Sequence, residues 1–146
     1  MRTVAGVLLL WAFIAAALAQ DNAPGEPRFV ADIELQTSAE FVELLQRASQ
    51  LLVDGAVPQD GVARVSLVLH GPVIRDLLRQ NYSENRELVN LAASLTALQV
   101  VEIKACQTWM ASNEVNSADL QPFVETVSFA PRELRRLIEE KNYLDF

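Results

Sequence analysis

The sequence has one cysteine, Cys106, and one histidine, His70, among its 146 residues. A single cysteine cannot form a disulfide within the chain. The sequence also lacks the paired Cys or Cys-His clusters and the H-E-x-x-H motif of zinc proteins, so we expect no metal site. Its five glycines form no phosphate-binding loop, and no G-x-S-x-G elbow of a serine hydrolase is present.

Basic residues are scarce as well. The chain has 12 Lys and Arg against 19 Asp and Glu, which gives a net charge of −7. Because no basic patch stands out, nucleic acid is not an expected partner. Hydrophobic residues make up 51% of the sequence, and the length fits one domain with a sizeable core.

The first 19 residues have the pattern of a secretory signal peptide. Arg2 is followed by an uncharged apolar run over 4–19, which ends in Ala17-Leu18-Ala19. The run is shorter than the ~20 residues that a membrane-spanning helix needs. We expect cleavage after Ala19, export, a periplasmic location if the source is Gram-negative, and no membrane attachment afterwards. An uncleaved anchor is the alternative. Residues 20–28 are the expected linker, and 29–146 form the expected domain.

Four stretches have the pattern of β-strands. Residues 29–35 alternate apolar and polar side chains, as in a half-buried strand towards a sheet edge. Residues 62–69 are almost continuously apolar, which is typical of a central parallel strand. Residues 100–106 place Val101, Ile103 and Ala105 on one face and end at Cys106. Residues 125–129 alternate again, with Val127 and Phe129 pointing inwards.

Helical patterns separate these strands, which favours an α/β fold. We predict a three-layer α/β/α arrangement with a mainly parallel sheet of about four to five strands. Thr37 and Glu40 form a capping box, which marks the start of the first helix, and Gly55 marks its end. The other expected helix starts are Pro72, Ser83, Ser117 and Pro131.

Cys106 and His70 each follow a predicted central strand. If these strands are neighbours, both side chains lie at the same edge of the sheet, within roughly 5–10 Å. A nearby imidazole favours the thiolate, which is the reactive form of cysteine. Two structural alternatives stay open: Cys106 as a buried structural residue, and His70 as a turn residue that hydrogen-bonds the backbone. We expect Glu102 and Lys104 on a solvated or interface face rather than in catalysis.

Large apolar side chains occur where a monomer would leave them exposed. Trp109 and Met110 follow Cys106 in an expected surface turn, and Tyr143, Leu144 and Phe146 lie in the C-terminal segment. Such residues are enriched at interfaces, so we expect a homo-oligomer. The alternative is that the C-terminal rings fold back onto the chain's own helices.

Three segments resemble the DsrE/DsrF-like sulfur-relay family, which includes YchN-like proteins. These are Leu67-Val68-Leu69-His70-Gly71-Pro72, the run Val101-Glu102-Ile103-Lys104-Ala105-Cys106-Gln107-Thr108-Trp109-Met110, and Leu120-Gln121-Pro122-Phe123-Val124-Glu125-Thr126-Val127. The resemblance covers about residues 29–146. It implies a compact α/β/α domain that assembles into trimers or hexamers. It also implies that Cys106 carries sulfur as a persulfide.

The leading hypothesis is therefore an exported sulfur carrier or transferase. The Cys106 thiolate would take sulfane sulfur from a donor and pass it to an acceptor thiol, on a protein or a small molecule, without a cofactor. His70 would support the thiolate, and Gly71, Gln107, Thr108 and Trp109 would form the substrate-binding part of the site.

Two other functions stay open. One is a non-catalytic oligomeric module that binds a small molecule or a protein, in which the cysteine only fills space. The other is a Cys-His hydrolase with Asp76 or Glu102 as the orienting acid.

Overall fold

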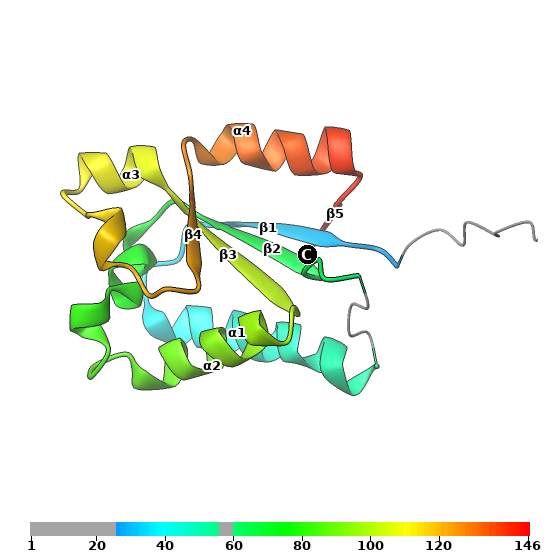
Figure 1. Ribbon diagram of the computed structural model, residues 1–146, viewed down its shortest axis with the longest axis horizontal. Helices are drawn as coiled ribbons and strands as arrows, with labels where there is room; N and C mark the ends of the chain where they lie inside the picture. The colour runs from blue at the N-terminus through cyan, green and yellow to red at the C-terminus, as the bar shows by residue number, and fades with distance from the viewer. Residues whose placement is uncertain (1–25, 56–59) are drawn as a thin grey trace, which may run out of the picture.

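Five parallel strands form the centre of the structure, a computed structural model that describes residues 26–55 and 60–146 (Figure 1). The expected signal peptide and most of the expected linker lie outside the described residues. The sheet has the order β4-β3-β2-β1-β5, so the predicted α/β fold with a parallel sheet is confirmed. The strands are β1 (Phe29–Ile33), β2 (Val65–Leu69), β3 (Val101–Cys106), β4 (Val124–Val127) and β5 (Leu144–Asp145).

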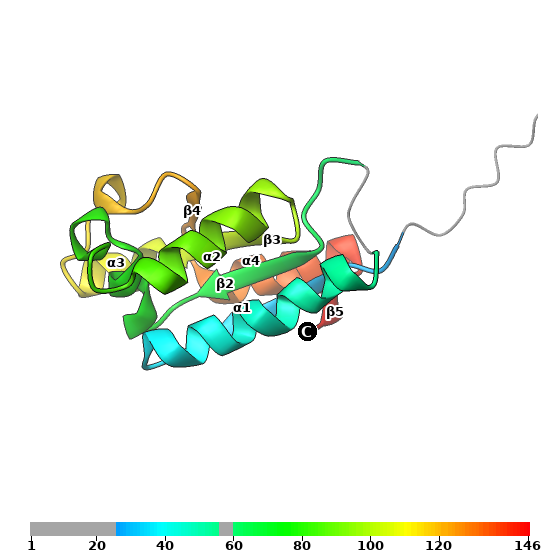
Figure 2. The same cartoon turned by 90° about the horizontal axis from the view of Figure 1, so that it is seen from below.

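Helices cover both faces of this sheet. In Figure 1, α1 and α2 lie below the strands and α4 lies above them; Figure 2 shows α1 and α2 side by side from below. Among the described residues, no helix is long and apolar enough to cross a membrane. The α-helices are α1 (Ser38–Val53), α2 (Arg86–Ala97), α3 (Gln107–Ser112) and α4 (Ala130–Arg135), and the π-helix η4 (Arg136–Glu140) continues α4. Short 3₁₀ helices are η1 (Pro72–Leu77), η2 (Arg79–Asn81) and η3 (Ser117–Asp119).

Local sequence signals place the first helix correctly and miss the starts of two others. The Thr37 side chain accepts from the backbone N–H of Glu40, and the Glu40 carboxylate accepts from the backbone N–H of Thr37, as the capping box predicts. The expected cap at Ser83 is wrong, because α2 begins after Asn85. The expected cap at Ser117 is also wrong, since the side chain of Asn116 caps η3.

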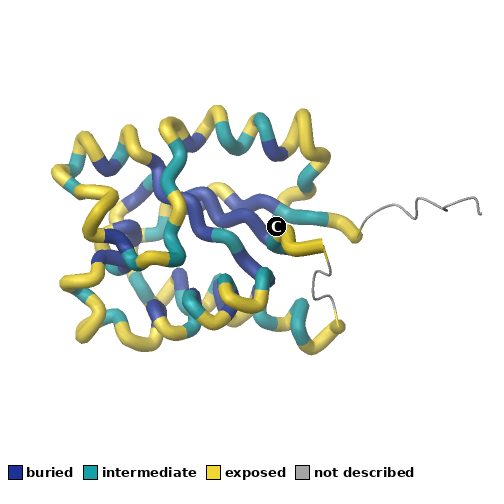
Figure 3. The backbone as a smooth tube through the Cα atoms, viewed as in Figure 1, coloured by how far each residue is buried: buried dark blue, intermediate teal, exposed yellow. Residues whose placement is uncertain are grey.

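The main core lies between the sheet and the pair α1 and α2. Phe41, Leu45 and Ala48 of α1 are fully buried against the odd-numbered side chains of β2 and β3. Figure 3 shows the inner strands as the most buried part of the chain. The expectation that 29–35 is half buried and near an edge is only partly correct. β1 is the second strand from the edge, and Val30, expected on the polar side, is buried beneath α4.

The opposite face of the sheet, beneath α4 and η4, is polar at its centre. The three buried polar residues of the described chain, Arg64, Ser66 and Lys104, all belong to this face by strand alternation. Lys104 is only 7% exposed and bonds to Glu102 at 2.8 Å and to Glu133 of α4 at 2.9 Å. The expectation that Lys104 lies on a solvated face is therefore wrong, because α4 covers it.

The Glu133 carboxylate connects this network to the helix. It accepts from Arg136 Nε at 2.8 Å and Nη2 at 2.7 Å, and from Lys104 Nζ. The hydrogen bonds from Arg136, helped by those from Lys104, outweigh burial and lower the pKa of Glu133 from 4.5 to about 2. The carboxylate therefore stays ionised in the folded protein under conditions in which the unfolded chain binds a proton.

This pKa shift predicts an acid-sensitive contribution to stability. A depressed folded-state pKa stabilises the fold above pH 4.5, and the contribution is lost as the pH falls from 4.5 towards 2. With allowance for solvent screening, we expect about 1–2 kcal/mol from this group. Urea unfolding between about pH 6 and pH 2 measures it. Glu133→Gln should show a shallower loss of stability over that range, and an unchanged slope would contradict the assignment.

The C-terminal segment packs on its own chain. β5 pairs with β1 through Leu144 and Asp145, and Phe146 N donates to Val30 O at 3.0 Å. The Phe146 ring lies 6.0 Å from the Phe29 ring, and the Arg47 guanidinium lies 5.4 Å from its centroid. Phe146 thus follows the alternative in which C-terminal rings fold back, so this ring is not an argument for an oligomer. The Leu144 side chain stays exposed.

Candidate functional site

Cys106 and His70 lie next to each other at the carboxyl edge of the sheet. β2 and β3 pair in parallel with Leu69 opposite Ala105. The next residue along each strand direction is His70 after β2 and Cys106 at the end of β3. Both side chains line one hollow of about 270 Å³. The structure therefore brings together the two residues that strand adjacency predicted to meet.

The Cys106 thiol forms part of the floor of this hollow and is only 3% exposed. The backbone N–H of Ala130, the first residue of α4, donates to Cys106 Sγ at 3.4 Å. The N–H groups in the first turn of a helix have no partner within the helix, and no side chain caps α4. The sulfur therefore accepts a hydrogen bond from a helix N–H that would otherwise need a capping side chain.

The walls of the hollow are mainly apolar. Phe129 is 45% exposed at its rim, so the expectation that this ring points into the core is wrong. No acidic or basic side chain other than His70 is among its lining residues. The lining residues are His70, Cys106, Thr108, Trp109, Ser112, Phe129, Ala130 and Pro131.

His70 pairs with a carboxylate that the sequence analysis did not identify. Its Nε2 contacts Asp32 Oδ1 on β1, the neighbouring strand. The side chain thus has an acidic partner, whereas the alternative reading of His70 had it bonding to the backbone. Asp32 lies opposite Val68, two residues before His70, and on the same face of the sheet as Cys106. Thiol, imidazole and carboxylate therefore come from three adjacent strands.

Neither acid considered from the sequence has this position. Asp76 is part of η1, where burial raises the pKa of its carboxyl. Glu102 lies on β3, four residues before Cys106, and pairs with Lys104. The sequence signal for Asp32 is its place as a polar side chain in the alternating strand 29–35, on the face that this pattern predicts to be less buried. A parallel strand next to the histidine strand places such a residue beside the imidazole.

Two of the four expected substrate-binding residues line the hollow, Thr108 and Trp109. Gln107 instead donates from Nε2 to Thr126 Oγ1 on β4 at 2.9 Å. Gly71 has a packing role, because a Cβ there would lie 3.3 Å from the Glu34 Cα. Thr108 Oγ1 donates to the Ser128 carbonyl at 2.7 Å and so fixes α3 to the segment after β4.

The expected polar turn after Cys106 is wrong, because α3 begins at Gln107 directly after the strand. As a consequence, Met110 faces inwards and is buried, whereas we expected it at the surface. Trp109 is half-buried, and the Arg75 guanidinium lies 5.8 Å from its ring centroid. Met110 is thus not available to a second subunit, whereas Trp109 keeps part of its surface at the hollow.

Within residues 26–55 and 60–146, no cluster of three or more His, Cys, Asp or Glu side chains is arranged to hold a metal ion. The hollow itself offers the thiol, the imidazole with its carboxylate partner, and a backbone N–H directed at the sulfur.

Comparison with known proteins supports the fold and leaves the activity open. No protein-family model and no curated protein matches the chain. Among solved structures, the chain is similar to MTH1491, a protein of unknown function from Methanobacterium thermoautotrophicum. The two share 20% identity with a TM-score of 0.62, over 83% of this chain and 98% of that one. At this identity the likeness shows a common fold only.

Proposed function

We propose that the protein is an exported sulfur carrier of the DsrE/DsrF-like kind, which holds sulfane sulfur on Cys106. The observation that carries the proposal is that the Cys106 sulfur opens onto a hollow shared with the His70–Asp32 pair. The resemblance of the segments around His70 and Cys106 to the sulfur-relay family supports the same chemistry. The predicted signal peptide supports export.

The proposed reaction is an exchange at sulfur that needs no external oxidant. The Cys106 thiolate attacks the outer sulfur of a donor persulfide, R–S–SH. A new S–S bond forms on Cys106, the donor S–S bond breaks, and R–S⁻ leaves, which gives Cys106–S–SH. An acceptor thiolate then attacks the outer sulfur, and the Cys106 thiolate is the leaving group. In this proposal His70, held by Asp32, and the Ala130 N–H stabilise the negative charge on sulfur in both steps.

A second candidate function is a binding module in which Cys106 only fills space. Its support is the burial of the thiol, which packs with Val30, Val68, Ala130 and Leu137 in a small apolar cluster. Free cysteines are commonly buried for packing alone. In that case the hollow would bind an apolar group without any transfer of sulfur.

Intact-mass spectrometry after incubation with polysulfide separates the two functions. A carrier gains the mass of one sulfur in the native state, loses it to a small thiol, and shows no gain as Cys106→Ser. Thr126→Ala, which removes a hydroxyl near the site but outside the hollow, should still load sulfur. A native protein that gains no sulfur, or gains it only in denaturant, would favour the binding module.

We also propose that the protein forms a homo-oligomer, as the family resemblance implies. Among the described strands, β4 is the outer strand beside β3, and the exposed Phe129 follows it. An open strand edge next to an exposed ring can pair with a second copy. Sedimentation equilibrium should give a trimer or a multiple of it. A single species with the mass of one chain, at tens of micromolar protein, would exclude the oligomer.

A further inference from the structure

A second cavity lies on the same face of the sheet as Cys106, at the opposite end of the strands. It has a volume of about 380 Å³ and opens beneath η4, at the amino ends of β1, β2 and β3. Cys106 terminates β3 at its carboxyl end and does not line this cavity. The lining residues are Arg28, Val62, Glu102, Lys104, Arg136, Leu137, Lys141 and Tyr143.

Positive charge is concentrated here in a chain whose net charge is −7. Four of the eight lining side chains are cationic and one is acidic. Glu133 reaches Lys104 and Arg136 from the side of the helix, and Asp60 pairs with Arg28, so four cations meet three acids and one positive charge is in excess. Burial lowers the pKa of Lys104, but its hydrogen bonds to Glu102 and Glu133 outweigh this effect, and the pKa lies above its usual value. The amine is therefore charged at neutral pH.

The donors of these cations are only partly used. An ammonium group has three N–H donors, and two of those on Lys104 go to Glu102 and Glu133. Arg136 directs Nε and Nη2 at Glu133, which leaves the Nη1 donors of the guanidinium. Donors thus remain on separate side chains from the sheet and the helix.

A neighbouring buried group adds to this polar surplus. Ser66 is fully buried opposite Glu102 in the register of β2 and β3, and its Oγ has no hydrogen-bond partner among the described residues. A buried hydroxyl without a partner is costly, because it loses its hydrogen bonds to water and gains none in return. These polar groups lie beside the small apolar cluster of Val30, Val68 and Leu137 on the same face of the sheet.

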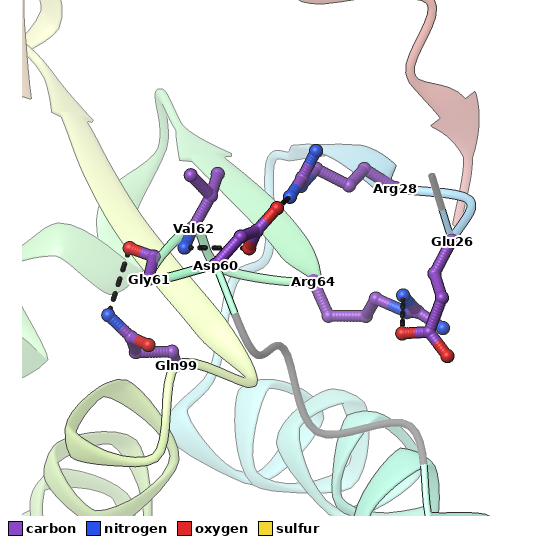
Figure 4. Close-up of polar contacts among 7 residues, drawn as sticks. All are labelled: Glu26, Arg28, Asp60, Gly61, Val62, Arg64 and Gln99. Carbon is purple, nitrogen blue, oxygen red and sulfur yellow. Dashed lines mark hydrogen bonds and ion pairs between the residues drawn. The ribbon is translucent and has the colours of Figure 1, made fainter. Parts of the chain in front are cut away.

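Two ion pairs lie outside the cavity, near the amino ends of β1 and β2 (Figure 4). Arg28 pairs with Asp60, and Arg64 Nη1 donates to Glu26 Oε2 at 2.6 Å. Both acids are exposed, so solvent screens their charge. Asp60 thus pairs with Arg28 from outside the cavity, and Glu102 is the acidic side chain in its lining.

We propose that this cavity binds a small ligand with a tetrahedral, multiply charged oxyanion, either phosphate or sulfate, free or as part of a small organic molecule. Single donors from several directions suit a tetrahedral oxyanion. A planar carboxylate is bound best by the paired donors of one guanidinium fork, and Glu133 already occupies that fork of Arg136. This site is separate from the Cys106 hollow, and its ligand does not depend on sulfur transfer.

Isothermal titration calorimetry on the full chain tests the proposal. Inorganic phosphate, sulfate and glycerol phosphate are titrated separately at constant ionic strength, with chloride as the reference. Saturable binding of at least one of these ligands supports the site. The order of their three affinities shows whether the site prefers a free ion or a phosphoryl group on a small organic molecule. No binding above that of chloride overturns it.

Variants locate the ligand. Arg136→Gln should weaken binding about tenfold or more, since a hydrogen bond to a charged group is lost. Lys141→Gln should weaken it less, and because Lys141 is exposed this change cannot act through unfolding. Arg135→Gln, an exposed change on the same helix outside the cavity, should bind as the parent does. Equal affinities for Arg135→Gln, Arg136→Gln and Lys141→Gln would contradict the assignment.

Discussion

Replacing Asp32 by asparagine is expected to slow the loading of sulfur onto Cys106 by about tenfold. The Asp32 carboxylate pairs with His70 Nε2 and so orients the imidazole that shares the hollow with the thiol. Positioned acid–base groups contribute about 10²–10⁴ in rate. The Asp32 side chain is 55% exposed, and solvent screening of the pair places the expected effect below that range.

The rate of mass gain with polysulfide and the rate of iodoacetamide labelling measure this effect. Glu34→Gln is the matched control, because Glu34 is an exposed carboxylate near the same strand end and is not paired with His70. His70→Ala should reproduce the loss, and Asp32→Asn should add nothing to it, since the carboxylate acts through the imidazole. If Asp32→Asn loads sulfur as fast as Glu34→Gln does, the pair has no role at the thiol.

Replacing Lys104 by methionine is expected to lower the free energy of unfolding by about 3 kcal/mol. Methionine fills the volume of the lysine stem, so the loss reports the charge and not a cavity. Without the ammonium group, the Glu102 and Glu133 carboxylates lie beside each other under α4 with one cation fewer. Breaking a buried ion pair from one side costs more than the pair contributes, because the other charge is left uncompensated.

A second substitution makes this prediction specific. Glu102→Gln should destabilise the parent, in which it removes a partner of Lys104, and should stabilise Lys104→Met, in which it removes like-charge repulsion. Urea unfolding of the two single variants and the double variant gives this cycle. Lys141→Met, at an exposed lysine, should change stability by less than about 0.5 kcal/mol. If Glu102→Gln changes the free energy of unfolding in the same direction in both backgrounds, the proposed network is contradicted.

The features that the sequence predicted well are those set by neighbouring residues or by a rule of the fold. The Thr37 capping box depends on residues three apart, and it marks the true start of α1. Parallel strands end at one edge of the sheet, so the sequence predicted that Cys106 and His70 meet if their strands are neighbours, and the β2–β3 pairing meets that condition. The order of the strands and the partner of His70 depend on packing between distant segments, which no local pattern specifies.

The errors about which side chains are buried on this face of the sheet share one physical cause, the packing of α4. Alternation shows which side chains share a face, but it does not show what covers that face. Lys104 and Val30 were expected on the more solvated side, and both are buried beneath α4. Phe129 was expected inwards, yet the chain turns into α4 there and leaves the ring at the rim of the hollow. A polar residue can be buried when a helix supplies its counter-charge.

The pairing of β5 with β1 has a consequence for the order in which the protein folds. The strands β1 to β4 follow one another across the sheet, so each can add to its neighbour as the chain is synthesised. The outer side of β1 has to wait for the segment at 144–145, more than a hundred residues later in the sequence. Contacts between such distant segments are slow to form, because a long loop must close before they contribute stability. The sheet is therefore completed last at the outer side of β1, beside Phe29 and Val30, after the β1–β2 edge that brings Asp32 to His70 has formed.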